Sequence, residues 1–513
     1  MQTAAGILVQ PFGTLPDLIA AHARERGDKT AIVHGEASLT YAQLDARMDA
    51  IAAALRRDGL RHGQAVAIVG AMSFDYAAIF LGAIRAGGAP APVAPSSTGD
   101  QMAAMIADSG TGVVLLDADA AAALGDRPVT AKRVALDASG AGTALDEWLG
   151  DARAPDPVAI APEDPFNIIY SSGTTGTPKG IVQPHAMRWA HIARNEAAGF
   201  ADAVTMIATP LYSNTTLVSF IPTLAWGGTA VLLGKFDARG FLEAAAKHRG
   251  THAMLVPVQY QRIMAVADFD SFDLSTFRLK TCTSAPFPPA LKADVLARWP
   301  GMLVEYYGMT EGGGTCVLMC NMFPNKLHTV GVPVAGHDIR LIDDEGREVA
   351  PGETGEVVGR SPAMMSGYHG RKQASADAEW FDADGNRYIR HGDVGRFDED
   401  GFLILMDRKK DLIISGGFNI YPSDLEAEAS KHPAVRDCAV VGVPSDQWGE
   451  TPVGFYVPAD DTPADEVLAT INAVLGKTQR LAALVQIDEL PRSAIGKVLK
   501  RELRDRYLEN APA

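Results

Sequence analysis

Cysteine is scarce in this sequence. The chain of 513 residues has four cysteines, and none of them belongs to a C-x-x-C pair. They stand in apolar or loop contexts, at Cys282, Cys316, Cys320 and Cys438. A disulfide framework is therefore not expected, and buried free thiols in a reducing cytosol are the better interpretation.

Long uncharged apolar segments are also missing. A membrane-spanning helix needs about 20 apolar residues in succession, and the best candidate, Tyr76–Ile84, is closed by Arg85. The first residues, Met1-Gln-Thr-Ala-Ala5, lack the basic segment with which a secretory signal peptide begins. We expect a cytoplasmic protein without a membrane span.

Positive charge is in deficit, because 46 lysines and arginines face 62 aspartates and glutamates and give a net charge of −16. A protein of this sign repels nucleic acids and anionic membranes, so neither is expected as its main partner. A phosphate-bearing ligand can still be held in a local pocket. The hydrophobic content of 47% is typical of a globular protein, and the length predicts at least two domains.

Short apolar segments alternate with helical patterns through much of the chain. Helical spacing of apolar residues begins after the cap signal Thr40 and ends near residue 60. The next segments alternate between strand and helix patterns: 66–69, 74–85, 89–93, 101–109 and 113–116, with a second series between 204 and 299. This rhythm predicts an α/β fold with mostly parallel sheets flanked by helices.

The pattern changes after about residue 330, where short alternating strands and turns predict a small β-rich subdomain over about 330–406. The charged cluster Asp407-Arg-Lys-Lys-Asp411 then interrupts the apolar strands, although a solvated hairpin turn would look the same. Beyond it, helical and strand patterns predict a compact α+β domain of ordinary size. We therefore expect a large N-terminal domain over 1–406 and a small C-terminal domain over 407–513.

The segment Tyr170–Gly180 reads YSSGTTGTPKG and follows an apolar strand pattern. Its hydroxyl groups and backbone N–H groups could hold phosphate oxygens, with Lys179 as a point charge. It is not a Walker A loop, because that pattern needs glycine where Pro178 stands. The alternative is a mobile Ser/Gly surface loop.

Five segments, in this order, resemble the adenylate-forming superfamily of acyl- and aryl-CoA synthetases, carrier-protein-loading adenylation domains and beetle luciferases. They are the loop 170–180, Tyr306-Tyr-Gly-Met-Thr-Glu311, Arg390-His-Gly-Asp393, Asp407–Pro422 and Pro491–Lys497. They resemble the family's phosphate loop, its Y-G-x-T-E and G-D segments, its hinge with the thioester-forming loop, and its C-terminal lysine loop. The resemblance extends from Leu39 to Lys497 and implies a small, mobile C-terminal domain.

The family's first reaction joins a carboxylate to the α-phosphorus of ATP and releases pyrophosphate. The resemblance implies that Lys497 contacts the carboxylate and the α-phosphate, that Glu311 binds Mg²⁺ with Thr174, and that Thr310 hydrogen-bonds phosphate. ATP or AMP contacts are implied for Ser171, Ser172, Gly173, Thr174, Thr175, Lys179, Ser284, Ala285, Pro286, Tyr306, Tyr307, Gly308, Asp393 and Arg408.

Within that set, Tyr307 would stack on adenine, and Asp393 with Arg408 would hold the ribose. Each residue has a plainer interpretation when taken singly. Glu311 could cap a helix, Tyr307 could be a core aromatic residue, and Lys497 could be a solvated surface charge.

The family's second reaction transfers the acyl group to a thiol after the C-terminal domain pivots. The resemblance implies Asp407 as the hinge. It implies the segment Ser415, Gly416, Gly417, Phe418 and Asn419 as the CoA and thioester loop. A Gly-Gly pair lets the backbone pass close to a narrow thiol tunnel, although it could also make a tight turn.

The expected acyl pocket is formed by Tyr212, Ser213, Asn214, Thr215, Ser219, Met309, Gly312 and Gly313. Tyr212 is not followed by the histidine that many acyl-CoA synthetases carry, so Tyr212 itself would gate the pantetheine channel. The aspartate with which amino-acid-activating relatives bind an ammonium group is also missing. Small and polar residues here would suit an acid with ring oxygens, but a flexible loop would have the same composition.

We therefore expect an AMP-forming carboxylate–CoA ligase, an acid–thiol ligase that uses ATP, Mg²⁺ and CoA. The expected substrate is an aryl or hydroxycinnamic (feruloyl-type) acid. The alternatives are a medium- or long-chain fatty acid, or a stand-alone adenylation enzyme that loads a carrier protein. A luciferase-like oxygenase has no separate signal, and Lys497, Glu311, Asp393 and Lys179 together disfavour a non-catalytic relative. A monomer or homodimer is expected.

Overall fold

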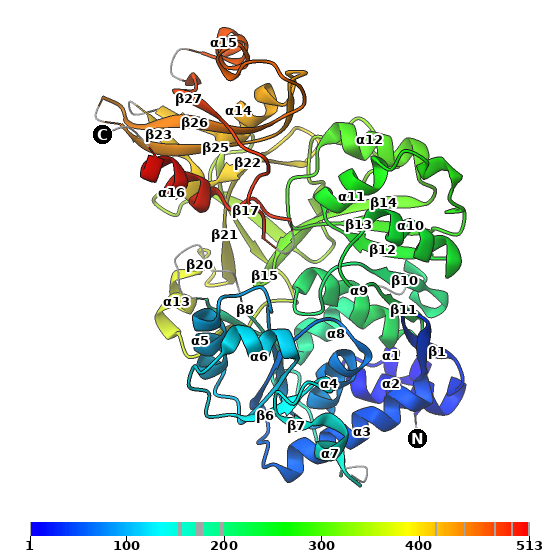
Figure 1. Ribbon diagram of the computed structural model, residues 1–513. Coiled ribbons are helices and arrows are strands. Elements are labelled where there is room, and N and C mark those ends of the chain that lie inside the picture. The colour runs from blue at the N-terminus through cyan, green and yellow to red at the C-terminus, as the bar shows by residue number, and fades with distance from the viewer. Residues whose placement is uncertain are drawn as a thin grey trace. The chain divides into compact units, whose positions relative to one another are not determined.

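The computed structural model describes residues 2–151, 156–170, 178–193, 198–415, 418–445, 447–476, 479–493 and 496–510 (Figure 1). The chain divides into two compact units. The first unit comprises residues 1–327, 333–338 and 360–389, and the second comprises 328–332, 339–359 and 390–513. Residues 390–406 thus share a unit with Asp407, and the predicted domain boundary and hinge at this residue stay predictions.

The largest sheet of the first unit is mostly parallel. Six of its strands run parallel to one another, and β2 and β15 are added antiparallel near its two ends. In spatial order its strands are β16 (Val332–Pro333), β15 (Gly312–Met319), β14 (Met302–Met309), β13 (Leu279–Cys282), β12 (His252–Leu255), β10 (Val204–Ile207), β11 (Thr229–Leu232), β1 (Thr30–His34) and β2 (Ala37–Thr40).

Helices connect and cover these strands, and α10, α11 and α12 lie beside β12, β13 and β14 in Figure 1. The helices of this part are α1 (Ala4–Leu8), α2 (Leu15–Arg26), α3 (Tyr41–Arg57), α8 (His185–Ala193), α9 (Asn214–Ala225), α10 (Ala238–Lys247), α11 (Pro257–Met264) and α12 (Pro289–Arg298), with short 3-10 turns at Phe200–Asp202 and Phe269–Ser271.

A second sheet of the same unit is entirely parallel, which matches the predicted alternation of strands and helices. Its order is β4 (Ala89–Val93), β3 (Ala65–Val69), β5 (Val113–Leu116), β6 (Lys132–Ala135) and β7 (Thr143–Ala144). The helices that alternate with these strands are α4 (Phe74–Arg85), α5 (Gly99–Ser109), α6 (Ala118–Leu124) and α7 (Leu145–Leu149).

Helix α3 shows why the sequence pattern was informative. Thr40 and Gln43 form a reciprocal capping box, with the Thr40 N–H donating to Gln43 (2.9 Å) and the Gln43 N–H donating to Thr40 (3.3 Å). This pairing satisfies backbone donors that the first helical turn would leave unpaired. One face of the helix then buries its apolar residues, among them Leu44, Met48 and Ile51. Periodic burial and a cap therefore fix this helix locally.

A third, antiparallel sheet is small, and it carries the segment predicted to hold phosphate. It consists of β8 (Pro165–Tyr170), β9 (Gly180–Pro184) and β19 (Gly367–Tyr368), with β9 in the middle. The connection between β8 and β9 includes residues 171–177, which lie outside the described residues. Helix α13 (Lys372–Asp377) and strand β20 (Glu379–Phe381) follow β19.

The β-rich segment forms a sheet as predicted, made of β17 (Asp338–Ile342), β18 (Gly355–Arg360), β21 (Arg387–Phe397) and β22 (Leu403–Arg408), with β20 paired to the first residues of β21. Strand β21 itself contains the division between the two units, at Ile389 and Arg390. A 3-10 turn, Lys409–Asp411, follows β22.

The C-terminal residues form an α+β layer structure in the second unit. Its sheet consists of β23 (Ile413–Ser415), β24 (Phe418–Ile420), β25 (Val435–Ser445), β26 (Gly449–Pro458) and β27 (Ala483–Gln486), and its helices are α14 (Pro422–Ala429), α15 (Ala464–Val474) and α16 (Lys500–Asn510). Alternate residues of β25 and β26 enter two separate apolar clusters, one with Leu425 and Ile471 and the other with Leu503. The sheet is therefore covered on both faces. The predicted fold class is confirmed.

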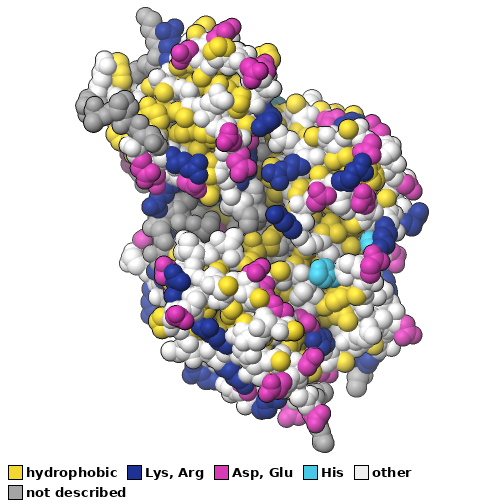
Figure 2. Space-filling view, in the orientation of Figure 1, with side chains coloured by type: hydrophobic (Ala, Val, Ile, Leu, Met, Phe, Trp, Pro, Cys, Tyr) yellow, Lys and Arg dark blue, Asp and Glu magenta, His cyan; other side chains and the backbone are white. Residues whose placement is uncertain are grey.

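Of the described residues, the charged side chains on the face shown in Figure 2 form no cluster of one sign, and the cysteines form no disulfide. On the face shown in Figure 2, acidic and basic side chains of the described residues are interspersed rather than gathered by sign. Cys282, Cys316 and Cys320 are buried, and all four cysteines are free thiols. Among the residues described, no helix is long and apolar enough to cross a membrane.

Candidate active site

The predicted Y-G-x-T-E segment forms a β-hairpin of the first unit. Tyr306 and Tyr307 lie on β14, and Thr310 and Glu311 form the turn into β15. The register shifts between Gly308 and Met309, which leads the chain into this turn. Because Glu311 lies in a hairpin turn, the alternative in which it caps a helix is wrong. Tyr307 is buried, with 8% of its surface exposed.

The three glycines after Glu311 have a backbone reason. Gly312, Gly313 and Gly314 all have positive φ angles, at 86°, 73° and 89°, where side-chain-bearing residues are strained. A Cβ atom on Gly312 would also lie 2.1 Å from the carbonyl oxygen of Ala363. The close approach of two backbone segments therefore requires glycine at position 312. This reason is independent of the kind of acid expected as the substrate.

Two other segments of the first unit hold the turn. The Met365 N–H donates to the Glu311 backbone oxygen (2.8 Å), and the Tyr368 hydroxyl donates to Glu311 Oε1 (2.8 Å). The Gln183 side-chain amide donates to the Thr310 backbone oxygen (2.7 Å). Burial, with the Glu311 charge as a second cause, raises the pKa of Tyr368. The phenol therefore stays protonated and able to donate to the carboxylate.

The described parts of the predicted phosphate loop lie next to these groups. The Lys179 Nζ atom lies 5.1 Å from the centre of the Tyr368 ring, a cation–π distance. Before the loop, the Tyr170 hydroxyl donates to Asp108 (3.0 Å), which also pairs with Arg371 (3.1 Å). The predicted phosphate ligands Ser171, Ser172, Gly173, Thr174 and Thr175 lie outside the described residues.

Glu311 fits a metal ion that is bound mainly through a substrate. Among the described residues there is no group of three or more His, Cys, Asp or Glu side chains that could hold a metal ion. Mg²⁺ usually takes one or two carboxylates and completes its shell with phosphate oxygens and water. In the contacts of the described residues, Tyr368 engages only one Glu311 carboxylate oxygen, Oε1. One carboxylate on a fixed turn suits that mode of binding.

Of the residues predicted for the acyl pocket, Tyr212, Ser213, Asn214, Thr215 and Ser219 lie at or near the start of α9, whereas Met309, Gly312 and Gly313 belong to the β14–β15 hairpin. Thr215 contacts the predicted adenine site. The Thr215 and Ser284 hydroxyls lie 2.6 Å apart, and Ser284 has a φ angle of 84°. Ala285 and Pro286 follow it. Ser219 donates its hydroxyl to the Thr216 carbonyl oxygen within α9 (3.1 Å), so this hydroxyl is engaged inside the helix. Burial raises the pKa of Tyr212, against a hydrogen bond with Ser96.

The second unit brings together the residues predicted for the ribose and the catalytic lysine. Asp393 and Arg408 are opposite each other on β21 and β22, and Arg408 Nε lies 2.9 Å from Asp393 Oδ1. Burial lowers the pKa of Lys497 to about 8. Burial is the largest cause of this lowering; the charges of Arg408 and Lys410 contribute to it, and those of Asp393 and Asp411 oppose it. Lys497 therefore lies within the field of the Asp393–Arg408 pair and is not a fully solvated surface charge.

Hydrogen bonds join Lys497 and Gly496 to residues 492 and 493. The Ser493 N–H donates to the Lys497 carbonyl oxygen (2.8 Å), and the Lys497 N–H donates to the Ser493 hydroxyl (3.2 Å). Arg492 donates to the Gly496 carbonyl oxygen (2.9 Å) and pairs with Asp437 (2.6 Å). These contacts anchor the loop to β25.

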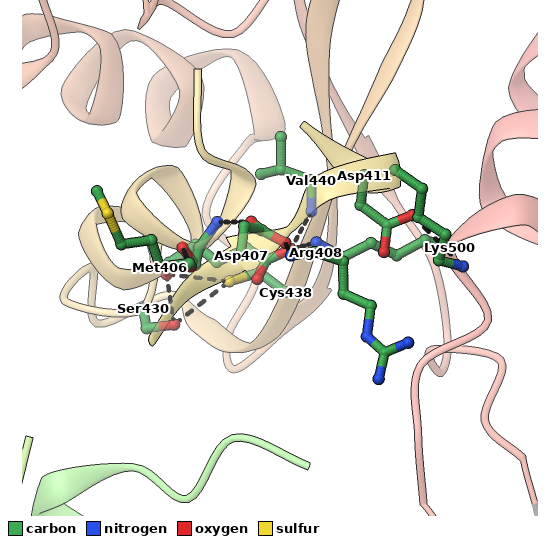
Figure 3. Close-up of polar contacts among 11 residues, drawn as sticks. Met406, Asp407, Arg408, Asp411, Ser430, Cys438, Val440 and Lys500 are labelled. Carbon is green, nitrogen blue, oxygen red and sulfur yellow. Dashed lines mark hydrogen bonds and ion pairs between the residues drawn. The ribbon is translucent and has the colours of Figure 1, made fainter. Parts of the chain in front are cut away.

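Asp407, the predicted hinge, caps the segment that follows it (Figure 3). Its carboxylate accepts from the N–H groups of Arg408 (2.7 Å) and Ser423 (2.9 Å). Nearby, Lys500 pairs with Glu426 (2.8 Å), whose carboxylate also accepts from the Val440 N–H (2.7 Å). In the predicted thioester loop, Ser415 is buried, Gly416 and Gly417 lie outside the described residues, and Phe418 and Asn419 belong to β24.

Sequence reasoning missed Gln183 and Tyr368. Both contact the predicted catalytic turn from strands of the small third sheet. A polar residue inside an apolar strand was the one available signal for Gln183, since a fully buried amide must find partners. Nothing in the local sequence around Tyr368 pointed to Glu311.

Comparison with known proteins agrees with this geometry. A family model described as AMP-binding enzyme matches residues 19–369, and one described as AMP-binding enzyme C-terminal domain matches residues 424–497. Feruloyl-CoA synthase from an Amycolatopsis species is 34% identical over an alignment of 509 positions, which covers 97% of this chain and 99% of that protein. Indoleacetate–CoA ligase from Aromatoleum aromaticum is 34% identical over 513 residues, covering 96% and 97% of the two chains.

The fold is similar to those of solved structures. The crystal structure of ATP-bound MatB from Rhodopseudomonas palustris superimposes with a TM-score of 0.85 at 28% identity, covering 96% of this chain and 99% of that one. The chain therefore belongs to the AMP-binding enzyme family. The predictions of an adenylate-forming relative and of an enzyme of the AMP-forming CoA ligase class are confirmed, and ATP and CoA are substrates of that class.

The close approach at Gly312 yields a stability prediction. Gly312→Ala should lower the free energy of unfolding by about 1–3 kcal/mol more than Gly336→Ala does, because overpacking adds to the backbone strain. Gly336 is a matched control, with a φ angle of 78° and nothing within 4 Å of its Cβ position. Denaturant unfolding of the two variants measures the difference. Equal destabilisation would show that the Ala363 contact is unimportant.

The pKa of Lys497 yields a pH prediction. The ammonium is present below pH about 8 and is lost above it, so acyl-adenylate formation should decline as the pH rises through about 8. Lys410→Met removes a positive charge that lowers this pKa, and should move the decline upward by about half a pH unit at low salt. Lys410→Arg keeps the charge and should leave the profile in place. Pyrophosphate exchange measured against pH tests this, and coincident profiles for wild type and Lys410→Met would contradict it.

Proposed function

We propose that this enzyme activates an aryl or hydroxycinnamic acid as its adenylate and transfers the acyl group to CoA. The observation that carries the proposal is the position of Lys497 beside the Asp393–Arg408 pair. The residue that would contact the α-phosphate is thus placed in one unit with those that would hold the ribose of the same nucleotide.

In the first step, the carboxylate oxygen attacks the α-phosphorus and pyrophosphate leaves. Negative charge builds up on the α-phosphate oxygens, and the Lys497 ammonium stabilises it because it is present before the reaction begins. Thr310 and the loop residues Ser171, Thr174 and Thr175 hydrogen-bond phosphate oxygens, with Lys179 as an added charge. Tyr307 and Ser284 flank the adenine.

Glu311 holds Mg²⁺, together with Thr174, and the bound ion neutralises phosphate charge. The support for this assignment is the position of Glu311, whose carboxylate accepts from Tyr368 and whose backbone oxygen accepts from Met365. Glu311 therefore does not need to reorganise when MgATP binds.

In the second step, the CoA thiol attacks the acyl carbonyl and AMP leaves. We assign the hinge to Asp407 and the thiol passage to the segment Ser415–Asn419. Asp407 lies near the end of β22, and hinges are usually found at such element-terminal positions.

The choice of an aryl acid is supported by the polar groups at the start of α9 and by the two relatives whose names specify aromatic acids. A fatty acid as substrate and a carrier protein as acceptor remain the alternatives. Gly312, which the backbone requires, no longer favours either kind of acid.

The test is carboxylate-dependent exchange between ATP and pyrophosphate over a panel of aryl and fatty acids. Product analysis with CoA or carrier protein as acceptor follows. We expect exchange with hydroxycinnamic or other aryl acids and thioester on CoA. Exchange with fatty acids alone would refute the substrate, and exchange without a CoA thioester would refute the acceptor. The absence of exchange with any acid would refute the ligase function.

Lys497→Ala separates the two steps. The variant should lose the adenylation rate by at least about a hundredfold, because a preorganised cation is removed from the developing charge. It should still convert a supplied acyl-adenylate and CoA into thioester. Lys431→Ala, which removes an exposed lysine of the same unit that pairs with Glu428, is the control. Equal loss of both partial reactions in Lys497→Ala would contradict the assignment.

A further inference from the structure

The Gln183 side chain is fully buried and every hydrogen-bonding position of its amide is used. Its Nε2 donates to the Thr310 backbone oxygen (2.7 Å) and to Asn214 Oδ1 (3.2 Å). Its Oε1 accepts from Asn167 Nδ2 (2.9 Å) and from Arg188 Nη2. A primary amide has two N–H donors and a carbonyl oxygen with two lone pairs, so this amide is saturated.

Arg188 determines which way the amide points. A guanidinium group only donates hydrogen bonds, so the Gln183 oxygen must face Arg188. Arg188 Nε also donates to Asn167 Oδ1 (3.1 Å), which turns the Asn167 N–H group toward Gln183 as well. With two donors on one side, the Gln183 N–H groups must point to the other side. The donation to Thr310 is therefore fixed by chemistry and does not depend on a choice between two amide orientations.

Gln183 lies on the central strand of the small third sheet. Strand β9 lies in the middle of the small third sheet, where Asn167 of β8 is opposite Gln183 and Tyr368 of β19 is opposite Ile181. The Thr310–Glu311 turn thus receives hydrogen bonds from side chains of two adjacent strands, Gln183 and Tyr368. The β8–β9 connection of this same sheet contains the segment proposed to hold phosphate.

We propose that Gln183 is a positioning residue that fixes the Thr310–Glu311 turn to the central strand of the small third sheet. Through Asn214 it also ties the turn to the first residue of α9, at the proposed acyl pocket. Gln183 itself touches no substrate. The inference rests on the roles given to Thr310 and Glu311 under the proposed function, and it adds the group that sets their position.

Two substitutions separate positioning from general packing. Gln183→Glu retains acceptors toward Arg188 and Asn167. It places oxygen against the Thr310 and Asn214 oxygens, however, and removes both donors. Gln183→Met keeps the approximate volume and removes all four hydrogen bonds. Gln259→Met is the matched control, because Gln259 is another buried glutamine of this unit that bonds two backbone groups, at Val256 and Ala208.

Pyrophosphate exchange and calorimetric ATP binding are the measurements, with thermal unfolding to confirm that each variant is folded. A misplaced catalytic turn costs about 10- to 100-fold in rate, so kcat should fall by this factor in both Gln183 variants. Binding of MgATP should weaken by about tenfold, because Glu311 no longer faces the metal–phosphate complex. Binding of ATP in EDTA should change by less than twofold. Gln259→Met should lose stability but keep MgATP binding within twofold of wild type.

The outcomes distinguish this inference from the proposed function. Near-wild-type exchange and MgATP binding in Gln183→Glu would show that Gln183 serves the fold alone, and would overturn the inference. If Gln183→Glu does not fold, Gln183→Met decides by the same criteria. A wild-type enzyme without exchange on any acid refutes the proposed function, and the comparison of MgATP with metal-free ATP still tests whether Gln183 positions Glu311.

Discussion

The hairpin that carries Glu311 depends on a backbone contact that leaves no room for a side chain. A Cβ atom on Gly312 would lie 2.1 Å from the Ala363 carbonyl oxygen, and the positive φ angle there favours glycine independently. Because the backbone near residue 363 passes so close, Met365 and Tyr368 reach Glu311 from the same segment. One steric constraint therefore brings the predicted metal ligand and two of its hydrogen-bond donors together.

Charge is distributed differently in the two units. In the first, the Thr310–Glu311 turn is held by neutral donors, an amide, a phenol and a backbone N–H group. In the second, cations crowd Lys497, and with burial they lower its pKa to about 8. The charge of this lysine is therefore sensitive to pH near 8.

Much of the fold could be predicted from the sequence because its signals are local. The helix Phe74–Arg85 and the strands Ala89–Val93 and Val113–Leu116 have the predicted bounds, since apolar periodicity and the turn residues beside it lie within the elements themselves. The five motif segments identified the family for the same reason. The roles of Lys497, Glu311 and Asp393 were expected from resemblance, and the structure adds the neighbours that surround them.

What the sequence determined alone was the family and the alternation of elements, and it predicted the residues that carry chemistry, because each is encoded in residues close together along the chain. Tertiary structure decided which partners orient those residues. Gln183 and Thr310 are 127 positions apart, and Tyr368 and Glu311 are 57 apart. No local pattern encodes such contacts, because they depend on how separate sheets pack. The reason for Gly312 is of the same kind, since only the folded backbone shows that Ala363 excludes a side chain there.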